Sequence, residues 1–511
     1  MTVIGAAEPS DSRHRLLTNT MECMNFRNIN LILLLLFCTF CSYAAVDLAT
    51  VQLKNGESRS YQQLLKDNGL PGISVAVVEN YKVIFTFAGG VKEAGKMEQI
   101  GPNTSFNAAS ISKPVVATLA VMLAEQGKLD LDAPVSKYLK TWTIPESDFT
   151  QNHAVTLRHL LAHTAGTSHS GYASNYAGEV IPTAVQTLRS YKNEAIAVTF
   201  EPGTSWKYSG GGFLIAQLVL EDVTGKSLAT LAEEMLFKPL GMKHSTFSQH
   251  GHANFPMNVA KAHNNNKEVI STGIPVCPQA ACGLWTNASD MALFAIEIQK
   301  ALAGKHTKVI SAKVAPQLIA IQTTELTGGW SLGWMRNAAV GNLGWFSHSG
   351  YNNGTGGLIM ATTENGRGIF VFGNGDYRAR VSTIDQIVAS VTTTLDWKKD
   401  IVPTKENIAK DFVDHLVGEY ENLTPHHFSP FAKKVTIEKQ GDHLVLINSE
   451  SGNDPLPIIF TAKNKFRVNE LVNSQLGLMI DAQGLIYITL EQPGSTVMSK
   501  ALRKRPKGNE I

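Results

Sequence analysis

The segment most informative about the fold is Phe106-Asn107-Ala108-Ala109-Ser110-Ile111-Ser112-Lys113-Pro114. Proline lacks an N–H and clashes with the preceding turn, so Pro114 belongs in the first turn of a helix. The residues that follow, up to Leu123, are apolar nearly all round, which is typical of a deeply buried helix. We therefore predict a buried helix from about Ser110 to Gly127.

Ser110 and Lys113 are three residues apart, so at a helix start their side chains share one face. A serine hydroxyl is a weak nucleophile that needs an adjacent base, and burial favours the uncharged form of a lysine. The free N–H groups of the helix N-terminus can also stabilise a developing oxyanion. The pair predicts nucleophile and base, although a motif this short arises by chance roughly twice in such a chain.

The surrounding pattern predicts an α+β fold. Two β-branched runs, 73–78 and 83–87, flank a turn at Glu79-Asn80, and two later strands, 356–361 and 368–372, flank a turn at Asn365-Gly366. Helices are expected between these pairs of strands. The expected helices are 157–163, 212–223, 228–237 and 290–301.

Several blocks in one order resemble the class C type of serine β-lactamase and its relatives, which are D-Ala-D-Ala carboxypeptidases, D-amino-acid peptidases and lactamase-like esterases. The resemblance covers about residues 69–393, and SxxK, here Ser110 to Lys113, is the first signature of that family. It implies an antiparallel sheet flanked by a helical region, and no cofactor. The further blocks are Gly127–Val135, Thr156–Gly166 and Lys238–Met242.

The second family signature is a tyrosine followed two residues later by an asparagine. Here Tyr208-Ser209-Gly210 stands in that place. The resemblance implies that Tyr208 shuttles the proton between Ser110 and the leaving group, which a phenol with an ordinary pKa near 10 can do if nearby lysine charge lowers that pKa. Gly210 removes the amide that helps to hold a substrate amide in the family, which favours ester cleavage over peptide or β-lactam turnover.

The third family signature is matched by His348-Ser349-Gly350 on a late strand. The resemblance implies that this strand lines the site and that His348 faces a substrate carboxylate or sets the electrostatics around Tyr208. The N–H groups of Ser110 and of Tyr351 are then the expected oxyanion donors.

A small all-β, barrel-like domain is expected after the main domain. We assign residues 45–398 to the main domain, 399–410 to a linker containing Pro403, and 411–507 to the β domain, which opens at Leu416–Tyr420. Regularly spaced short strands with turn signals carry this expectation. The expected strands are 435–437, 444–447, 466–468, 476–480 and 485–490.

The N-terminus, residues 1–44, reads as an extension followed by a secretory signal. A weakly basic segment, 24–30, precedes an apolar run, 31–40, and small residues that place cleavage after Ala44. We therefore expect an exported protein, periplasmic or secreted, that would contact a membrane only through an uncleaved leader. Three of the five cysteines leave with the leader, and Cys277 and Cys282 remain as either a short disulfide or two buried thiols.

The composition argues against several partners. A formal net charge of +2, from 45 basic and 43 acidic side chains, gives no reason to expect nucleic acid as a partner. The histidines show no metal-ligand spacing such as HExxH, so no metal is expected. They fall into two groups, His153, His159, His163 and His169, and His244, His250, His252 and His263.

Two functions follow from these observations. The first is a serine hydrolase that acts on a small-molecule or peptide substrate through an acyl-enzyme on Ser110, with an ester ranked before a D-amino-acid peptide and a β-lactam. The second is a non-catalytic protein of the same fold that binds peptidoglycan fragments or a protein partner. The presence together of Ser110, Lys113, Tyr208 and His348 favours the enzyme.

Overall fold

The structure is a computed structural model that describes most of the chain between Asp47 and Trp397 and the strands of a C-terminal barrel. The predicted leader, its cleavage after Ala44 and the predicted linker lie outside the described residues. Those residues are 47–53, 55–252, 255–323, 329–337, 344–397, 416–422, 434–441, 443–448, 455–462, 465–468, 475–480, 486–491 and 498–504.

A six-stranded sheet with the order β4-β3-β12-β11-β10-β9 forms the centre of the main part of the chain, and every pair in it is antiparallel. The early and late strand pairs expected from the sequence are confirmed, and they meet where β3 pairs with β12. The strands are β3 (Gly72–Glu79), β4 (Lys82–Gly90), β9 (Met335–Asn337), β10 (Trp345–Asn352), β11 (Thr355–Thr362) and β12 (Gly368–Gly373).

The turn between β3 and β4 lies one residue later than expected. Glu79 pairs with Lys82, which leaves Asn80 and Tyr81 as the loop, with φ of 52° and 63°. Two left-handed residues match the right-handed twist of a hairpin, so the backbone twist sets this turn. The turn at Asn365-Gly366, with φ of 61° and 59°, is where the sequence predicts it.

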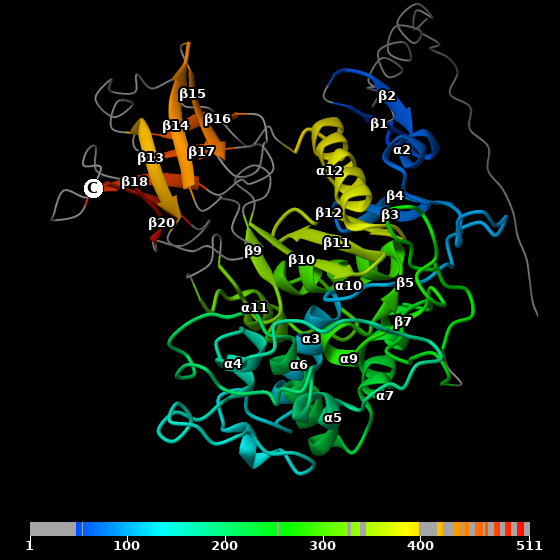
Figure 1. Ribbon diagram of the computed structural model, residues 1–511, viewed down its shortest axis with the longest axis vertical. Coiled ribbons are helices and arrows are strands. Elements are labelled where there is room, and N and C mark those ends of the chain that lie inside the picture. The colour runs from blue at the N-terminus through cyan, green and yellow to red at the C-terminus, as the bar shows by residue number, and fades with distance from the viewer. Residues whose placement is uncertain are drawn as a thin grey trace, which may run out of the picture. The chain divides into compact units, whose positions relative to one another are not determined.

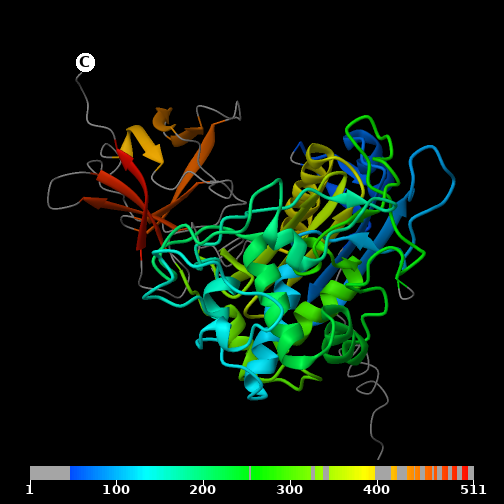
Figure 2. The ribbon, with the colours of Figure 1, turned by 60° about the horizontal axis from the view of Figure 1, so that its bottom comes forward.

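Helices cover both faces of the sheet, and the alternation along β3 separates the two cores. Val75 and Val77 pack in a core with helices α2 (Tyr61–Asn68) and α12 (Tyr377–Thr394), whereas Ala76 and Val78 belong to the core shared with the helical region. Figures 1 and 2 show α12 and α2 on one side of the sheet and the cyan and green helices on the other.

The buried helix α3 (Ser112–Glu125) is the centre of the helical region, and every residue from Ser112 to Leu123 is buried. It begins two residues after Ser110, because the backbone turns sharply at Ala109 (φ 49°) before it becomes helical. Pro114 lies in the first turn, as expected. The surrounding helices are α4 (Leu157–Leu161), α5 (Ala184–Arg189), α6 (Gly210–Thr224), α7 (Leu228–Ala232), α8 (Lys238–Leu240), α9 (Gln279–Cys282), α10 (Ala288–Leu302) and α11 (Val314–Ile319).

The expected helix at 228–237 is not one regular helix. It is α-helical as α7 and then takes the wider π form over Glu233–Phe237. Among the described residues, no helix is both long enough and apolar enough to cross a membrane.

In the described part of the chain, three two-stranded sheets tie loops to the main body of the fold. The pair of β5 (Phe106–Asn107) with β8 (Trp285–Thr286) anchors the chain immediately before Ser110. The other strands are β1 (Thr50–Gln52) with β2 (Ser58–Ser60), and β6 (Asn175–Tyr176) with β7 (Pro275–Val276).

The C-terminal strands close into a barrel in which β13 pairs with both β14 and β20. Figure 2 shows these strands, coloured orange to red. Tyr420 on β13 is fully buried, and its hydroxyl donates to the carbonyl of Leu416 at 2.7 Å. The strands are β13 (Gly418–Asn422), β14 (Lys434–Gln440), β15 (His443–Asn448), β16 (Leu456–Ala462), β17 (Lys465–Val468), β18 (Gln475–Ile480), β19 (Ile486–Glu491) and β20 (Met498–Lys504).

Candidate active site

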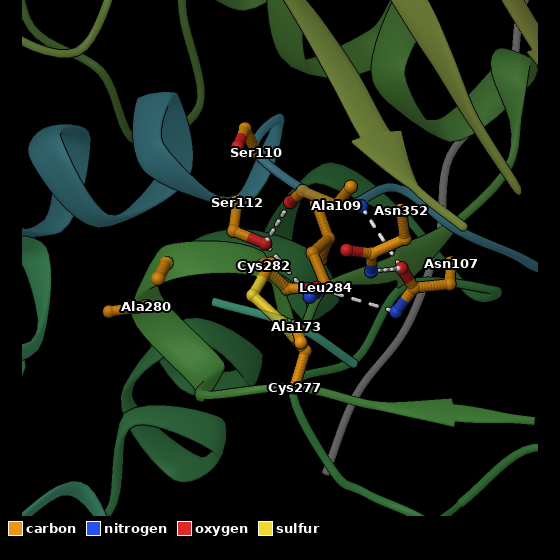
Figure 3. Close-up of a disulfide and its surroundings, with 12 residues drawn as sticks. Asn107, Ala109, Ser110, Ser112, Ala173, Cys277, Ala280, Cys282, Leu284 and Asn352 are labelled. Atoms are coloured by element: carbon orange, nitrogen blue, oxygen red, sulfur yellow. Dashed lines mark hydrogen bonds between the residues drawn. A yellow bond between two sulfur atoms is a disulfide. The ribbon is translucent and has the colours of Figure 1, made fainter. Parts of the chain in front are cut away.

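The segment before α3 holds Ser110 in a fixed backbone conformation. Asn107 accepts hydrogen bonds on its Oδ1 from the N–H of Ala109 at 3.2 Å and from Nδ2 of Asn352 at 2.5 Å. The Ser112 hydroxyl donates to the carbonyl of Ala109 and accepts from the N–H of Leu284 (Figure 3). These bonds support the left-handed conformation of Ala109, which is otherwise unfavourable for a residue with a Cβ.

Lys113 reaches back from α3 to Ser110. Its Nζ lies 3.1 Å from Oγ of Ser110 and donates at 2.7 Å to the carbonyl of Ala281. Lys113 is 1% exposed, whereas Ser110 is half-buried. Within the described part of the chain, no carboxylate lies at ion-pair distance from this amine.

Burial lowers the pKa of Lys113 to about 7. The cause is the removal of the ammonium from water, since charge is costly in an apolar site. A lysine with this pKa is about half uncharged at neutral pH, so it can accept the Ser110 proton and return it.

Tyr208 lies on the other side of the amine. Nζ of Lys113 is 4.9 Å from the centre of its ring, and its phenol shares a hydrogen bond with Ser110. The condition that lysine charge lowers the pKa of Tyr208 is not met, because burial raises this pKa above the ordinary value by more than the bond to Ser110 lowers it. Tyr208 is therefore a neutral phenol at neutral pH, able to pass a proton on but not to act as a standing phenolate.

His348 on β10 is buried and neutral. Burial and the nearby Lys113 charge lower its pKa to about 3, against a smaller opposing effect of the Ser349 carbonyl. Its Nδ1 lies 2.6 Å from that carbonyl, so Nδ1 carries the proton and Nε2 is left as an acceptor. In this uncharged state, the imidazole of His348 offers no positive charge for an ion pair with a substrate carboxylate.

His163 also lies at the site, although no role was expected for it from the sequence. Its ring centre is 4.3 Å from that of Tyr208, and its Nδ1 accepts from the N–H of Ser209 at 3.0 Å. Its Nε2 therefore carries the proton. Burial lowers its pKa well below the usual value, with further lowering by Lys113 and His348.

Two imidazole nitrogens around Tyr208 are thus buried without a hydrogen-bond partner among the described residues. They are Nε2 of His163, a donor, and Nε2 of His348, an acceptor. Both rings also contact the ring of Trp330, at 5.0 Å and 5.6 Å between centres. His163 lies in the family-like block Thr156–Gly166, but neither it nor Trp330 belongs to one of the three signatures that point to the site, so the cluster was not expected from the sequence.

Strand β10 approaches the nucleophile segment through Gly350. A Cβ on Gly350 would lie 2.0 Å from the carbonyl oxygen of Ala108, so only glycine fits this approach. The Ser349 and Tyr351 side chains point to the exposed face of the strand, and Asn352 reaches Asn107. The sequence-predicted residues of β10 are therefore brought next to the Ser110 segment.

Gly210 is the first residue of α6, and the space beside it is occupied. A Cβ at this position would lie 3.2 Å and 3.3 Å from carbons of the Tyr172 ring. Tyr172 in turn packs edge-on against His169 and Tyr191, at 5.9 Å and 4.7 Å between ring centres. An aromatic ring thus lies against the position of the absent asparagine side chain.

Cys277 and Cys282 form a disulfide in the structure, drawn in Figure 3, so of the two alternatives the structure has the bond. Both residues are buried. Among the described residues, no group of three or more histidine, cysteine, aspartate or glutamate side chains could hold a metal ion.

The family model described as Beta-lactamase matches residues 58–392. The chain therefore belongs to the β-lactamase family, as the arrangement of Ser110, Lys113 and the antiparallel sheet indicates. Among curated proteins, it is 27% identical over 228 residues to Protein flp of Staphylococcus aureus, and the aligned region covers 44% of this chain and 43% of that protein. It is 28% identical over 197 residues to Esterase EstB of Burkholderia gladioli, and the aligned region covers 37% of this chain and 50% of that protein. The chain thus spans half or less of the length of these relatives.

Solved structures share the fold at lower identity. The octameric penicillin-binding protein homologue from Pyrococcus abyssi superposes with a TM-score of 0.53 at 20% identity, covering 87% of this chain and 98% of that one. The hydrolase EstCE1, described as having promiscuous acyltransferase activity, superposes with a TM-score of 0.53 at 19% identity, covering 65% and 96%. At this level of identity, the likeness concerns the fold.

Proposed function

We propose that the protein is a serine hydrolase that works through an acyl-enzyme on Ser110. The observation that carries the proposal is the 3.1 Å contact between Oγ of Ser110 and the amine of Lys113, whose pKa burial lowers to about 7. A nucleophile in hydrogen-bond reach of a base poised near the working pH is the arrangement that acyl transfer needs.

In the first step, Oγ of Ser110 bonds to the substrate carbonyl carbon while its proton passes to Nζ of Lys113. The carbonyl oxygen becomes an oxyanion, for which we propose the backbone N–H groups of Ser110 and Tyr351 as donors. The bond to the leaving group then breaks, and the leaving oxygen takes a proton from the Tyr208 phenol, which Lys113 reprotonates. In the second step, water attacks the acyl carbon and gives a proton to the same pair. The bond from this carbon to Oγ of Ser110 then breaks, and the proton passes to Oγ, which restores the serine hydroxyl and releases the acid.

Esters are the proposed substrate class, ahead of D-amino-acid peptides and β-lactams. Three observations support this order: Gly210 offers no side-chain amide, the Tyr172 ring lies against that position, and one relative is an esterase. The neutral state of His348 also offers no charge to a substrate carboxylate.

Turnover of a short-chain p-nitrophenyl ester by the purified protein tests the proposal, with Ser110→Ala as control. Turnover that is lost in Ser110→Ala is the expected result. Equal rates in both proteins, or no turnover in either, would exclude ester hydrolysis by Ser110. If the protein also formed no covalent adduct with a β-lactam, the non-catalytic alternative would be favoured.

We also propose that the protein is exported, with cleavage after Ala44. The leader pattern in residues 24–44 and the Cys277–Cys282 disulfide, a bond typical of oxidising compartments, support this proposal. N-terminal sequencing of protein recovered outside the cytoplasm is expected to begin at Ala45. Recovery of the whole pool from the cytoplasm with residues 24–44 attached would contradict export.

A further inference from the structure

The carbonyl that holds the Lys113 amine belongs to a segment closed by a disulfide. Ala281 lies in α9, a helix that spans only Gln279–Cys282. Cys277 precedes this helix, Cys282 is its last residue, and the bond between them encloses the whole turn (Figure 3). The 2.7 Å contact from Nζ of Lys113 to the Ala281 carbonyl therefore ends inside the closed loop.

The residues immediately after the loop hold the nucleophile segment. The carbonyl of Cys282 accepts from Nδ2 of Asn107 at 3.4 Å, and the carbonyl of Leu284 accepts from the N–H of Ala108 at 2.8 Å. The N–H of Leu284 donates to Oγ of Ser112 at 2.9 Å. One short stretch thus supplies hydrogen-bond partners both to the base and to residues on either side of Ser110, namely the Asn107 amide, the Ala108 N–H and the Ser112 hydroxyl.

The residues before the loop lead to another part of the site. Val276, next to Cys277, pairs with Asn175 through strands β7 and β6. The neighbouring Tyr176 donates from its hydroxyl to the carbonyl of Asn353, in the turn that follows β10, at 3.4 Å. The disulfide therefore joins a strand connected to the end of β10 with the helix that contacts Lys113.

Besides the covalent bond, the turn is held by neighbouring polar groups: the N–H of Ala280 donates to Oε1 of Gln217 at 3.1 Å, and Nε2 of Gln279 donates to the carbonyl of Phe247 at 2.8 Å. A helix of one turn is not stable on its own, because nucleation costs more than a single hydrogen bond returns. The N-cap of α9 is Pro278, which makes no side-chain capping bond. A disulfide that closes so short a loop restricts the unfolded chain less than one that closes a long loop, so its main consequence here is local.

We propose that the Cys277–Cys282 disulfide is a positioning element of the active site, which holds the Ala281 carbonyl against the Lys113 amine and the Leu284 backbone against the Ser110 segment. The inference rests on the proposed serine-hydrolase function. Neither cysteine takes part in the chemistry. The bond acts through Lys113 and through the backbone of residues 107–112.

Removal of both sulfurs, in Cys277→Ala with Cys282→Ala, tests the inference by ester turnover as a function of pH. We expect kcat to fall by about tenfold or more with a smaller change in KM, because a misplaced catalytic group lowers the rate more than it lowers binding. Water that reaches the amine through a loosened α9 is expected to move the acidic limb of the kcat profile to higher pH. The other titratable side chains that face Lys113 are Tyr208, His163 and His348, and all three remain in the variant.

Two further variants keep the test decisive. Cys277→Ala alone breaks the same bond but retains the Cys282 side chain, and it serves if the double variant does not fold. Ile387→Val, a buried change on α12, is the control for a general loss of stability, and it is expected to leave the pH profile in place.

A folded variant without the bond that keeps the wild-type kcat and pH limb would overturn the inference. Failure of the proposed function gives a different result, since the intact disulfide-bonded protein would then show no turnover that depends on Ser110.

Discussion

The Nζ atom of Lys113 lies between two oxygens, Oγ of Ser110 at 3.1 Å and the carbonyl of Ala281 at 2.7 Å. The carbonyl takes one N–H of the uncharged amine and so leaves its lone pair available for the serine proton. The same amine is buried, which lowers its pKa to about 7. The orientation of the Lys113 amine is thus set by a backbone carbonyl, whereas its basicity is set by its apolar surroundings.

Lys113→Ala is expected to lower kcat/KM for an ester by about 10³-fold, within the range that a general base contributes. Lys113→Arg is expected to be equally impaired, because a guanidinium stays protonated at neutral pH. Steady-state kinetics at pH 8 checks both variants, and circular dichroism spectra establish that they fold. A Lys113→Arg protein with near wild-type activity would exclude Lys113 as the base.

The pH profile of kcat/KM is expected to rise with a single ionisation near pH 7 and to level off above it. Only uncharged Lys113 can accept the Ser110 proton, and the fraction uncharged increases as pH passes through its pKa of about 7. A profile that is flat between pH 5 and 9 would contradict the assignment of Lys113 as a poised base.

Tyr208→Phe is expected to lower kcat by about 10²-fold or more with little change in KM, since it removes a proton relay but keeps the ring. A p-nitrophenolate leaving group needs little protonation on departure. The fall in kcat should therefore be smaller with a p-nitrophenyl ester than with an alkyl ester. No loss for either ester would argue that Tyr208 acts by packing alone, and an equal loss for both would argue that its hydroxyl does not protonate the leaving group.

Gly210→Asn is expected to destabilise the protein by about 1–3 kcal/mol, the usual cost of overpacking, because its Cβ would press on the Tyr172 ring. Gly210→Asn combined with Tyr172→Ala provides the space and should recover most of that stability. Urea unfolding of the two variants and of Tyr172→Ala measures the coupling. Additive losses would mean that Tyr172 does not occupy the asparagine position.

His348 makes stability depend on pH. Its pKa is about 3 in the folded protein, whereas the ordinary value is near 6.5. Below pH 6.5, the unfolded chain therefore binds a proton at this histidine that the native protein does not bind. The contribution of neutral His348 to the free energy of unfolding is fully present above pH 6.5 and is lost as the pH falls toward 3. The change in unfolding free energy between pH 7 and pH 4.5 should therefore be smaller in His348→Asn than in the wild type, while the exposed-site control His306→Asn should match the wild type.

The sequence predicts the parts of this fold that depend on local pattern. The apolar, β-branched run at 73–78, the Pro114 signal and the apolar residues after Ser110 predicted the strands of the sheet and the buried helix α3. The turn at Asn80-Tyr81 and the π form of Glu233–Phe237 were missed, because backbone twist and packing decide them rather than residue type.

The site is less predictable than the fold. Ser110, Lys113, Tyr208 and His348 are found by motif, and the structure brings all four together. Ala281 contributes only a backbone carbonyl, and His163, Trp330 and Tyr172 reach the site from distant segments through packing. The sign of the pKa shift of Tyr208 depends on burial, which no motif records.

Rapid-quench measurement on an activated p-nitrophenyl ester is a direct test for an acyl-enzyme on Ser110. We predict a burst of p-nitrophenolate equal to the enzyme concentration and, after acid quenching and peptide mapping, an acyl group on Ser110. The adduct should form more slowly in Lys113→Ala and be absent in Ser110→Ala. An acyl group on another residue, or turnover with no acyl-enzyme on Ser110 when deacylation is rate-limiting, would contradict the account.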